Sequence, residues 1–193
     1  MQLSYGLMQN AVCWPRAYLL CLILFIPENT YANLPSEYDV KLAYLYNFTR
    51  FVDWPKSAFD RSDSPYSICI MGRIPSYSAA KKLEQKQSRN RPIDVTVITS
   101  EQPTHSCHLL YITKSVKYAR FSSRVKGIDN TTVTVGETPG FAKHGGEIGF
   151  VMDNRNHVKI EVNVSNALAK GIEIRAKLLE VASKIYRNEN RNK

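Results

Sequence analysis

The sequence lacks any long apolar run, with no stretch of about 18 or more consecutive apolar residues among its 193 positions. A transmembrane helix requires such a run, so a stable membrane span is not expected. Internal repeats and low-complexity tracts are also missing, while 44% of the residues are hydrophobic. These features argue against disordered and collagen-like chains and indicate one globular domain.

The motifs of common enzyme classes are missing too. There is no G-x-S-x-G, no H-E-x-x-H, no phosphate-binding G-x-x-x-x-G-K-S/T and no dinucleotide fingerprint. No nucleophile can be paired with a general base, which makes a hydrolase the least favoured function. The sequence therefore predicts no catalytic residue and no cofactor.

Acidic residues are scarce relative to basic ones. The chain has 26 Lys and Arg residues against 17 Asp and Glu residues, which gives a net charge of +9. A charge of this size favours an anionic partner, and by itself it suggests nucleic acid or an anionic membrane surface.

The N-terminus has the order of features of a secretory signal peptide. Arg16 precedes a ten-residue apolar block, Ala17–Ile26, and Thr30 and Ala32 place small residues at positions −3 and −1 of a cut after Ala32. Ten residues span only about 15 Å as a helix, half of the hydrocarbon core. The alternative is a buried N-terminal helix.

We predict that residues 1–32 are a cleaved signal peptide, with translation starting at Met1 or at Met8. Residues 33–193 then form one exported domain, which keeps a net charge of +9. Export removes nucleic acid from the expected partners. Anionic lipids, cell-envelope polymers, phosphorylated ligands and acidic protein surfaces remain.

Cysteine is also scarce, and only Cys69 and Cys107 lie in the mature domain. In an oxidising compartment an even number favours one disulfide, which stabilises a loop of this length by roughly 3–4 kcal/mol. Free thiols are one alternative. A metal site of His105, Cys107 and His108 is another, but His108 would point away from the other two on a strand, and no second ligand pair has the usual spacing.

Helix and strand patterns alternate through the mature domain. Apolar residues three and four apart predict a first helix over Glu37 to Val52, ended by Pro55. Apolar and β-branched runs predict six strands, at 66–71, 93–99, 107–113, 131–135, 147–152 and 157–164. Three more helices are expected: from Pro75 to about Gln87; after Ser115, carrying Tyr118, Phe121 and Val125; and at the C-terminus through Ile174, Leu178, Val181 and Ile185, with a Glu180–Lys184 pair on its outer side.

This order of elements predicts the α/β class. We expect a single-domain α/β/α sandwich with a mostly parallel sheet of about six strands, covered by helices. A turn at 153–156 predicts an antiparallel hairpin, which we place at one edge of the sheet.

Several ordered blocks make the chain similar to the YfiR family. The blocks are 41–55 (KLAYLYNFTRFVDWP), 67–72, 107–112 (CHLLYI), 134–142 (TVGETPGFA), 145–151, 158–163 (VKIEVN) and 176–179 (AKLL). They cover about Glu37 to Ala182, nearly all of the mature domain. Their order and separation make the resemblance specific, although each block alone would be weak.

The resemblance implies a periplasmic α/β sandwich with no known catalytic activity. The best-known members repress an inner-membrane diguanylate cyclase by binding its periplasmic sensor part, and an outer-membrane lipoprotein can sequester them. Release of the cyclase raises cyclic di-GMP and favours biofilm. Members can form homodimers. The resemblance also implies a Cys69–Cys107 disulfide, whereas a second cysteine pair found in some members has no counterpart here.

Three places in the mature domain are candidate contact sites for a partner or ligand. A glycine-rich loop offers exposed backbone on a rigid sheet, and Lys159, Glu161 and Asn163 alternate along one strand face with Arg175 as a candidate neighbour. Arg73 follows the first strand, where open α/β sheets tend to bind ligands. The loop candidates are Gly136, Pro139, Gly140, Phe141, Lys143 and His144. The alternatives are a purely structural loop and a solvated strand face.

Two functions from different classes are consistent with these features. The first is an exported, non-enzymatic regulator that binds and represses the periplasmic sensor part of a membrane diguanylate cyclase, lowering cyclic di-GMP and biofilm formation. The alternative is a periplasmic protein that binds a small anionic solute. The second predicts a saturable site whose occupancy raises the melting temperature.

Overall fold

The structure is a computed structural model that describes residues 35–99, 107–116, 128 and 130–187. These residues belong to one compact unit, Pro35–Lys193. The predicted signal peptide, His105 and the helix predicted after Ser115 with Tyr118, Phe121 and Val125 lie outside the described residues. Within the described ranges, no helix has the length and apolar character needed to cross a membrane.

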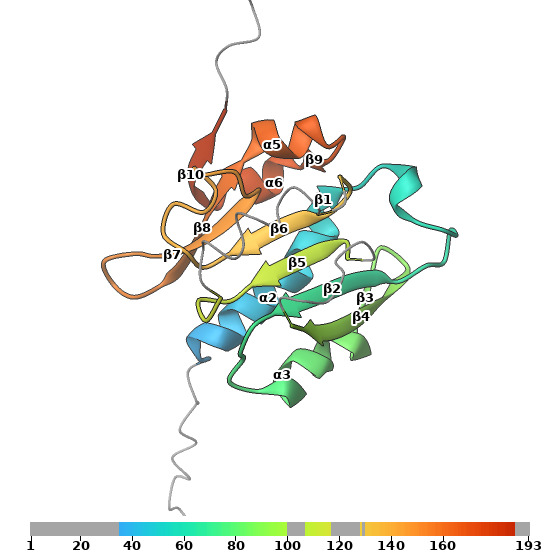
Figure 1. Ribbon diagram of the computed structural model, residues 1–193, viewed down its shortest axis with the longest axis horizontal. Helices are drawn as coiled ribbons and strands as arrows, with labels where there is room; N and C mark the ends of the chain where they lie inside the picture. Colours follow the sequence, from blue (N-terminus) through green and yellow to red (C-terminus); the bar gives the residue numbers. More distant parts are fainter. Residues whose placement is uncertain (1–34, 100–106, 117–127, 129, 188–193) are drawn as a thin grey trace, which may run out of the picture. The chain divides into compact units, whose positions relative to one another are not determined.

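Within the described residues, a mostly parallel sheet of eight strands forms the centre of the unit (Figure 1). The strands run in the order β10-β8-β7-β6-β5-β2-β4-β3, with antiparallel pairing for β7–β8 and β4–β3 and parallel pairing elsewhere. Their bounds are β2 Tyr66–Met71, β3 Gln87–Ser88, β4 Arg91–Ile98, β5 Leu109–Ile112, β6 Val133–Gly136, β7 Ile148–Met152, β8 Val158–Asn163 and β10 Ala182–Tyr186. The predicted α/β class and mostly parallel sheet are confirmed, and the sheet is larger than the expected six strands.

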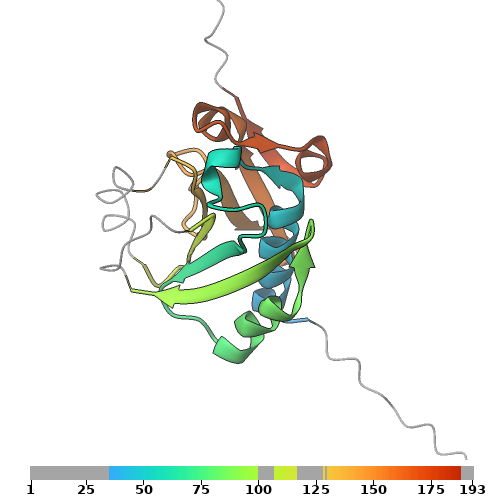
Figure 2. The same cartoon turned by 90° about the vertical axis from the view of Figure 1, so that its right-hand side faces the viewer.

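Helix α2 (Glu37–Phe51) confirms the first predicted helix. A capping box begins it, because the Ser36 hydroxyl accepts from the Asp39 amide and the Asp39 carboxylate accepts from the Ser36 amide. Leu45 and Phe48 are fully buried in the larger core. The helix lies against one face of the sheet (Figure 2). The other described helices, α3, α5 and α6, contribute residues to the same core.

The opposite face of the sheet has a second, smaller core. Cys69, Met71, Leu110 and Ile112 point to this face, and Phe141 packs against them. All the described α-helices contribute to the larger core, so a helix layer on this second face, as in an α/β/α sandwich, remains a prediction.

The helix predicted from Pro75 to Gln87 is wrong in extent. The chain forms α3 (Tyr77–Lys81) and a 3-10 helix, η3 (Lys82–Gln85). The start is later than expected because the Ser76 hydroxyl accepts from the Ala79 amide and caps α3. The chain is extended again at Lys86, because the next residues form edge strand β3 beside β4.

The predicted C-terminal helix is also wrong. After β8 come α5 (Val164–Ala169), β9 (Glu173–Ile174), α6 (Ala176–Leu179) and then strand β10, while β9 pairs with β1 (Val52–Asp53) in a small separate sheet. Strand β10 pairs in parallel with β8. The free edge of β8 offers backbone hydrogen bonds that override the helical pattern, and β-branched Ile185 suits an extended chain.

This rearrangement has two consequences at that edge of the sheet. The β7–β8 hairpin is confirmed, but it is not at the edge of the sheet, because β10 pairs with the outer edge of β8. The Glu180–Lys184 helical pair does not form, since Lys184 belongs to strand β10 and pairs with Glu161.

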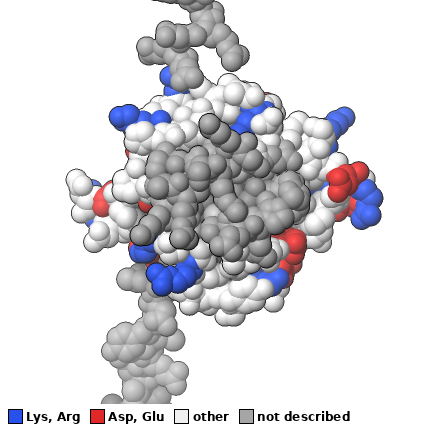
Figure 3. Space-filling model, viewed as in Figure 1, with Lys and Arg blue, Asp and Glu red and all other residues white. Residues whose placement is uncertain are grey.

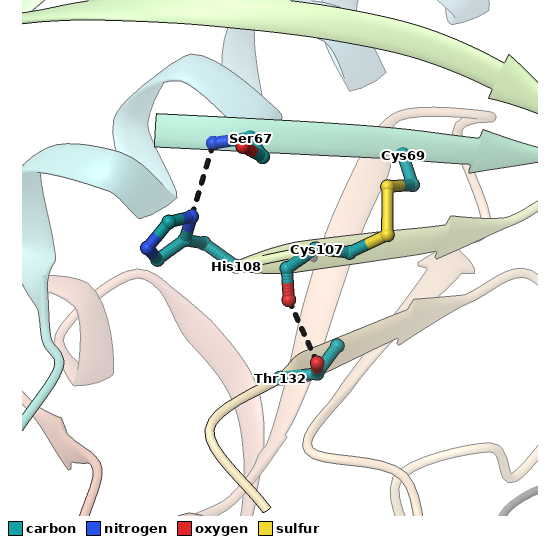
Figure 4. Close-up of a disulfide and its surroundings, with 5 residues drawn as sticks. All are labelled: Ser67, Cys69, Cys107, His108 and Thr132. Carbon is teal, nitrogen blue, oxygen red and sulfur yellow. Dashed lines mark hydrogen bonds between the residues drawn. A yellow bond between two sulfur atoms is a disulfide. The ribbon is translucent and has the colours of Figure 1, made fainter. Parts of the chain in front are cut away.

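The predicted disulfide is confirmed between Cys69 in β2 and Cys107 just before β5, with 5.7 Å between the Cα atoms (Figure 4). Beside it, the Thr132 hydroxyl donates to the Cys107 carbonyl at 2.7 Å. The Ser67 amide donates to His108 Nδ1 at 3.1 Å, while His108 Nε2 lies 2.8 Å from the carbonyl of Ala58 in the segment 56–58. Because His108 Nδ1 accepts a hydrogen bond, the proton of the neutral ring is on Nε2. The sulfur of Cys107 is bonded to Cys69 and is not available as a ligand, which excludes the metal-site alternative.

Candidate functional site

A cavity of about 630 Å³ opens at the carboxyl ends of three adjacent parallel strands. Arg73 follows β2, Thr113 to Ser115 follow β5, and Glu137 follows β6; the first turns of α2, from Ser36 to Lys41, complete the wall. In Figure 1 the arrowheads of β2, β5 and β6 point toward the end of the sheet where α2 begins.

The cavity lies at the point where the strand order reverses. From β2 the chain proceeds to β4 on one side, whereas β5, on the other side of β2, leads on to β6 in the opposite direction. Open α/β sheets bind ligands outside the carboxyl ends of the strands at such a switch point. The position predicted for Arg73 is therefore next to the cavity that this topology creates.

The two strand ends are held tightly together at the switch point. The Arg73 amide donates to the Ser115 hydroxyl at 2.8 Å, and the hydroxyls of Ser115 and Thr113 are 2.8 Å apart. Gly72 has a φ of 106°, and a Cβ there would come closer than 3.0 Å to both hydroxyls. A residue without a side chain is needed for this approach.

Buried charges form the floor of the cavity. The Lys41 ammonium contacts the carboxylates of Glu37 and Glu137, and the Tyr111 hydroxyl donates to Glu137. The side chains of Lys41 and Glu137 are only 6% and 9% exposed. The Lys41 hydrogen bond holds the pKa of Glu37 below its usual value, whereas burial and the hydrogen bond to Glu137 raise the pKa of Tyr111.

The Tyr38 hydroxyl is the unusual group of the site. Tyr38 lines the cavity, is 9% exposed, and its buried hydroxyl has no hydrogen-bond partner among the described residues. Burial, followed by the charges of Asp39 and Glu137, raises the pKa of Tyr38 to about 12, so the hydroxyl keeps its proton. A buried donor without a partner costs about 1–3 kcal/mol, and among the described residues the Trp54 indole nitrogen and the Ser88 hydroxyl are in the same condition.

The mouth of the cavity is cationic and its walls are largely apolar. Arg73 and Lys114 are exposed at the mouth, and neither forms an ion pair within the part of the chain that the structure describes. Ile74 and Pro75 form an apolar wall. Such an arrangement is suited to holding a small molecule by its charge and its apolar surface. Among the described residues there is no cluster of three or more His, Cys, Asp or Glu side chains that could hold a metal ion.

A second cavity of about 460 Å³ adjoins the first and shares Glu37, Lys41, Lys114 and Glu137 with it. Its far side is formed by Pro139 and by Phe150 to Met152. The buried charges of the floor thus lie between the switch point and the glycine-rich loop, and Pro139 is the predicted loop residue that lines this second cavity.

The six predicted residues of the glycine-rich loop divide into exposed and less exposed ones. Pro139, Lys143 and His144 are exposed, while Gly136 and Phe141 are buried and Gly140 is half-buried with a φ of 72°. In Figure 3 the Lys and Arg side chains visible around the grey residues form separate groups, interspersed with Asp and Glu. The exposed residues are the ones that remain candidates for partner contact.

The Phe141 ring leaves no space for a side chain at two glycines of the loop. A Cβ at Gly136 or at Gly146 would lie closer than 3.0 Å to this ring, which is 2% exposed. The ring therefore occupies space that any side chain at these positions would need, and it anchors the loop to the second core.

We expect Gly146→Ala to lower the free energy of unfolding by about 1–3 kcal/mol, because the added methyl group overpacks the Phe141 ring. The measurement is urea unfolding of the variant, of Phe141→Ala and of the double variant. In the Phe141→Ala background the methyl group has space, so its cost should largely disappear. An equal cost in both backgrounds would contradict this packing.

The second predicted group does not form one site. Lys159 and Glu161 are half-buried on β8, and Glu161 accepts from the Tyr186 hydroxyl at 3.1 Å. Asn163 is buried, donates to the Ala142 carbonyl at 2.8 Å and caps α5, which is a structural role. Arg175 lies elsewhere.

Arg175 forms a two-hydrogen-bond ion pair with Asp53 of the small β1–β9 sheet, at 2.6 and 3.0 Å. Arg89 contacts the same carboxylate, and together they hold the pKa of Asp53 below its usual value. The guanidinium of Arg175 is thus engaged in the packing of β1 and β9.

Sequence reasoning missed Tyr38, Lys41, Tyr111 and Glu137. One signal was available, because Lys41 lies on the same helical stripe as buried Leu45, and a lysine on an apolar stripe needs a buried partner. Nothing local indicates that this partner is Glu137, which is 96 residues away.

A family model described as YfiR/HmsC-like matches residues 38–183. No curated protein matches the chain significantly. The family match covers nearly all of the compact unit, including the described residues that line the cavity other than Ser36 and Glu37.

Proposed function

Because the chain belongs to the YfiR/HmsC-like family, we propose that it is an exported, non-enzymatic regulator that represses a membrane diguanylate cyclase. It binds the periplasmic sensor part of the cyclase and lowers cyclic di-GMP and biofilm formation. The family match over residues 38–183 carries this proposal.

Two features of the chain support an action in the periplasm. Residues 1–32 have the pattern of a cleaved signal peptide, and the Cys69–Cys107 disulfide suits an oxidising compartment. An outer-membrane lipoprotein that competes for the regulator, and a homodimer, belong to the same proposal.

Repression follows from a difference in affinity for two states of the sensor. The regulator binds the inactive arrangement more tightly and so increases its population. A change from 1:99 to 99:1 in favour of the inactive state requires about 10⁴-fold tighter binding to that state. We place the contact on the exposed part of the glycine-rich loop, around Pro139, Lys143 and His144.

Deletion of the gene in its native host is expected to raise intracellular cyclic di-GMP, since the cyclase loses its repressor. A restored full-length copy should reverse the rise, and a copy without residues 1–32 should not. The measurement is nucleotide quantification in cell extracts. An unchanged level after deletion, or rescue by the copy without residues 1–32, contradicts the proposal.

The contact surface is tested in the same assay with two matched charge reversals. Lys143→Glu lies in the glycine-rich loop, whereas Lys177→Glu lies on exposed α6. We expect loss of repression for Lys143→Glu and full repression for Lys177→Glu. Equal behaviour of the two variants contradicts the placement of the contact on the loop.

A further inference from the structure

We propose that the cavity at the carboxyl ends of β2, β5 and β6 is a binding site for a small organic anion, a carboxylate or phosphate monoester on an apolar or aromatic body. This inference goes beyond the repressor proposal, because the site binds its ligand whether or not the chain acts on a cyclase. Its location at the switch point of the sheet is the first argument for it.

The balance of charges in the cavity selects an anion. The two carboxylates, Glu37 and Glu137, are both engaged with Lys41 on the floor. Arg73 and Lys114 at the mouth form no ion pair within the described residues, although the charge of Lys114 also helps to lower the pKa of Glu37, and the described lining carries a net charge of +1. A cationic ligand would meet these two side chains first, whereas an anionic one would be held by them.

The Tyr38 hydroxyl supplies the specific polar contact. Its oxygen is buried within the cavity wall and has no acceptor among the described residues, so the ligand reaches it through a small displacement of the surrounding wall. An anionic oxygen of the ligand would satisfy it, and hydrogen bonds from a neutral donor to a charged acceptor are among the stronger ones in proteins.

The size and the apolar walls of the cavity favour an organic ligand over a bare inorganic anion. A volume of about 630 Å³ lies in the range of pockets that hold organic ligands, generally about 300–1,000 Å³. Ile74, Pro75 and the rings of Tyr38 and Tyr111 present apolar surface, so a ring or hydrocarbon body is buried along with the anionic group.

The test uses the purified, disulfide-bonded mature protein and four probes. 1-Naphthyl phosphate and 1-naphthoate combine the anion with an apolar body, and the two distinguish a phosphate ester from a carboxylate as the preferred group. Inorganic phosphate carries only the anion, and 1-naphthalenemethanol only the body. We expect at least one of the first two to raise the melting temperature saturably, and the last two to act much more weakly.

Variants locate the binding. Replacing both mouth cations, in Arg73→Ala/Lys114→Ala, should weaken the better probe at least about tenfold in calorimetric titration. The matched control removes two other exposed cations, in Arg155→Ala/Lys177→Ala, and should leave the affinity unchanged. If both double variants lost the same affinity for the probe, the binding would be a non-specific attraction to the net positive charge, which would overturn the proposal.

Tyr38→Phe separates a binding role from a structural one. Removal of an unpartnered hydroxyl should raise the melting temperature of the ligand-free protein by about 2–4 °C, yet weaken the better probe about tenfold. A variant with unchanged affinity overturns the assigned role of Tyr38. No saturable shift with either anionic probe on the wild-type protein overturns the site itself, and neither result depends on the cyclase.

Discussion

Replacing Lys41 by Met is expected to lower the free energy of unfolding by about 3–5 kcal/mol, the cost of leaving a buried charge without its partner. Lys41 and Glu137 have side chains that are 6% and 9% exposed and that contact each other directly. Methionine fills nearly the same volume but leaves the Glu137 carboxylate with Tyr111 as its remaining hydrogen-bond partner. The loss therefore reports the uncompensated charge and not a cavity.

A second substitution should recover most of that loss. In Lys41→Met/Glu137→Gln the buried charge is gone, while the new amide oxygen can still accept from Tyr111. Glu37, whose side chain is 45% exposed, can be hydrated once Lys41 is absent. Replacement of both members of a buried pair is often nearly neutral, so the double variant should be more stable than Lys41→Met.

Urea unfolding of the single and double variants measures this coupling. Arg61→Met is the matched control, because it also removes a paired cation, but the Arg61 and Asp63 side chains are 75% and 73% exposed. That ion pair is hydrated, so little change is expected. If Lys41→Met costs no more than Arg61→Met, the buried pair is not what stabilises the floor of the cavity.

Removal of the disulfide, in Cys69→Ala/Cys107→Ala, is expected to cost about 4 kcal/mol on the loop-entropy model. The two cysteines are 38 positions apart, and the loop between them includes all of β4. Without the bridge, the unfolded chain gains the freedom of that whole loop. Alanine is preferred to serine because both positions are buried, at 5% and 4% exposure, and offer no new hydroxyl a partner.

The urea midpoint with and without dithiothreitol gives the measurement. The reductant should lower the midpoint of the wild-type protein and leave that of Cys69→Ala/Cys107→Ala unchanged, which provides the internal control. A wild-type midpoint that is insensitive to reductant, in a protein shown to be reduced, would mean that the bridge adds no stability.

The sequence by itself determined the elements whose signals are local. The stripe from Leu42 to Phe48 predicts α2, and the β-branched alternation at 93–98 predicts β4, because a helix and a half-buried strand each impose their own period on apolar residues. The β7–β8 hairpin follows from its turn, in which Asn156 adopts a φ of 59° that asparagine tolerates well.

Local signals failed where two conformations compete. The segment from Ile174 to Tyr186 has a helical spacing of apolar residues, yet most of it becomes α6 and β10. The deciding factor is the unpaired edge of β8, which is created only when the sheet assembles, and no pattern within the segment reveals it.

Only the tertiary structure brought the cavity together. Arg73, Thr113 and Glu137 each follow a different strand, and they meet because β2, β5 and β6 are adjacent and parallel in the folded sheet. Lys41 and Glu137 are likewise joined across 96 positions. Strand order and register are set by long-range pairing, so a sequence can indicate that Lys41 needs a buried partner, while the fold decides which residue it is.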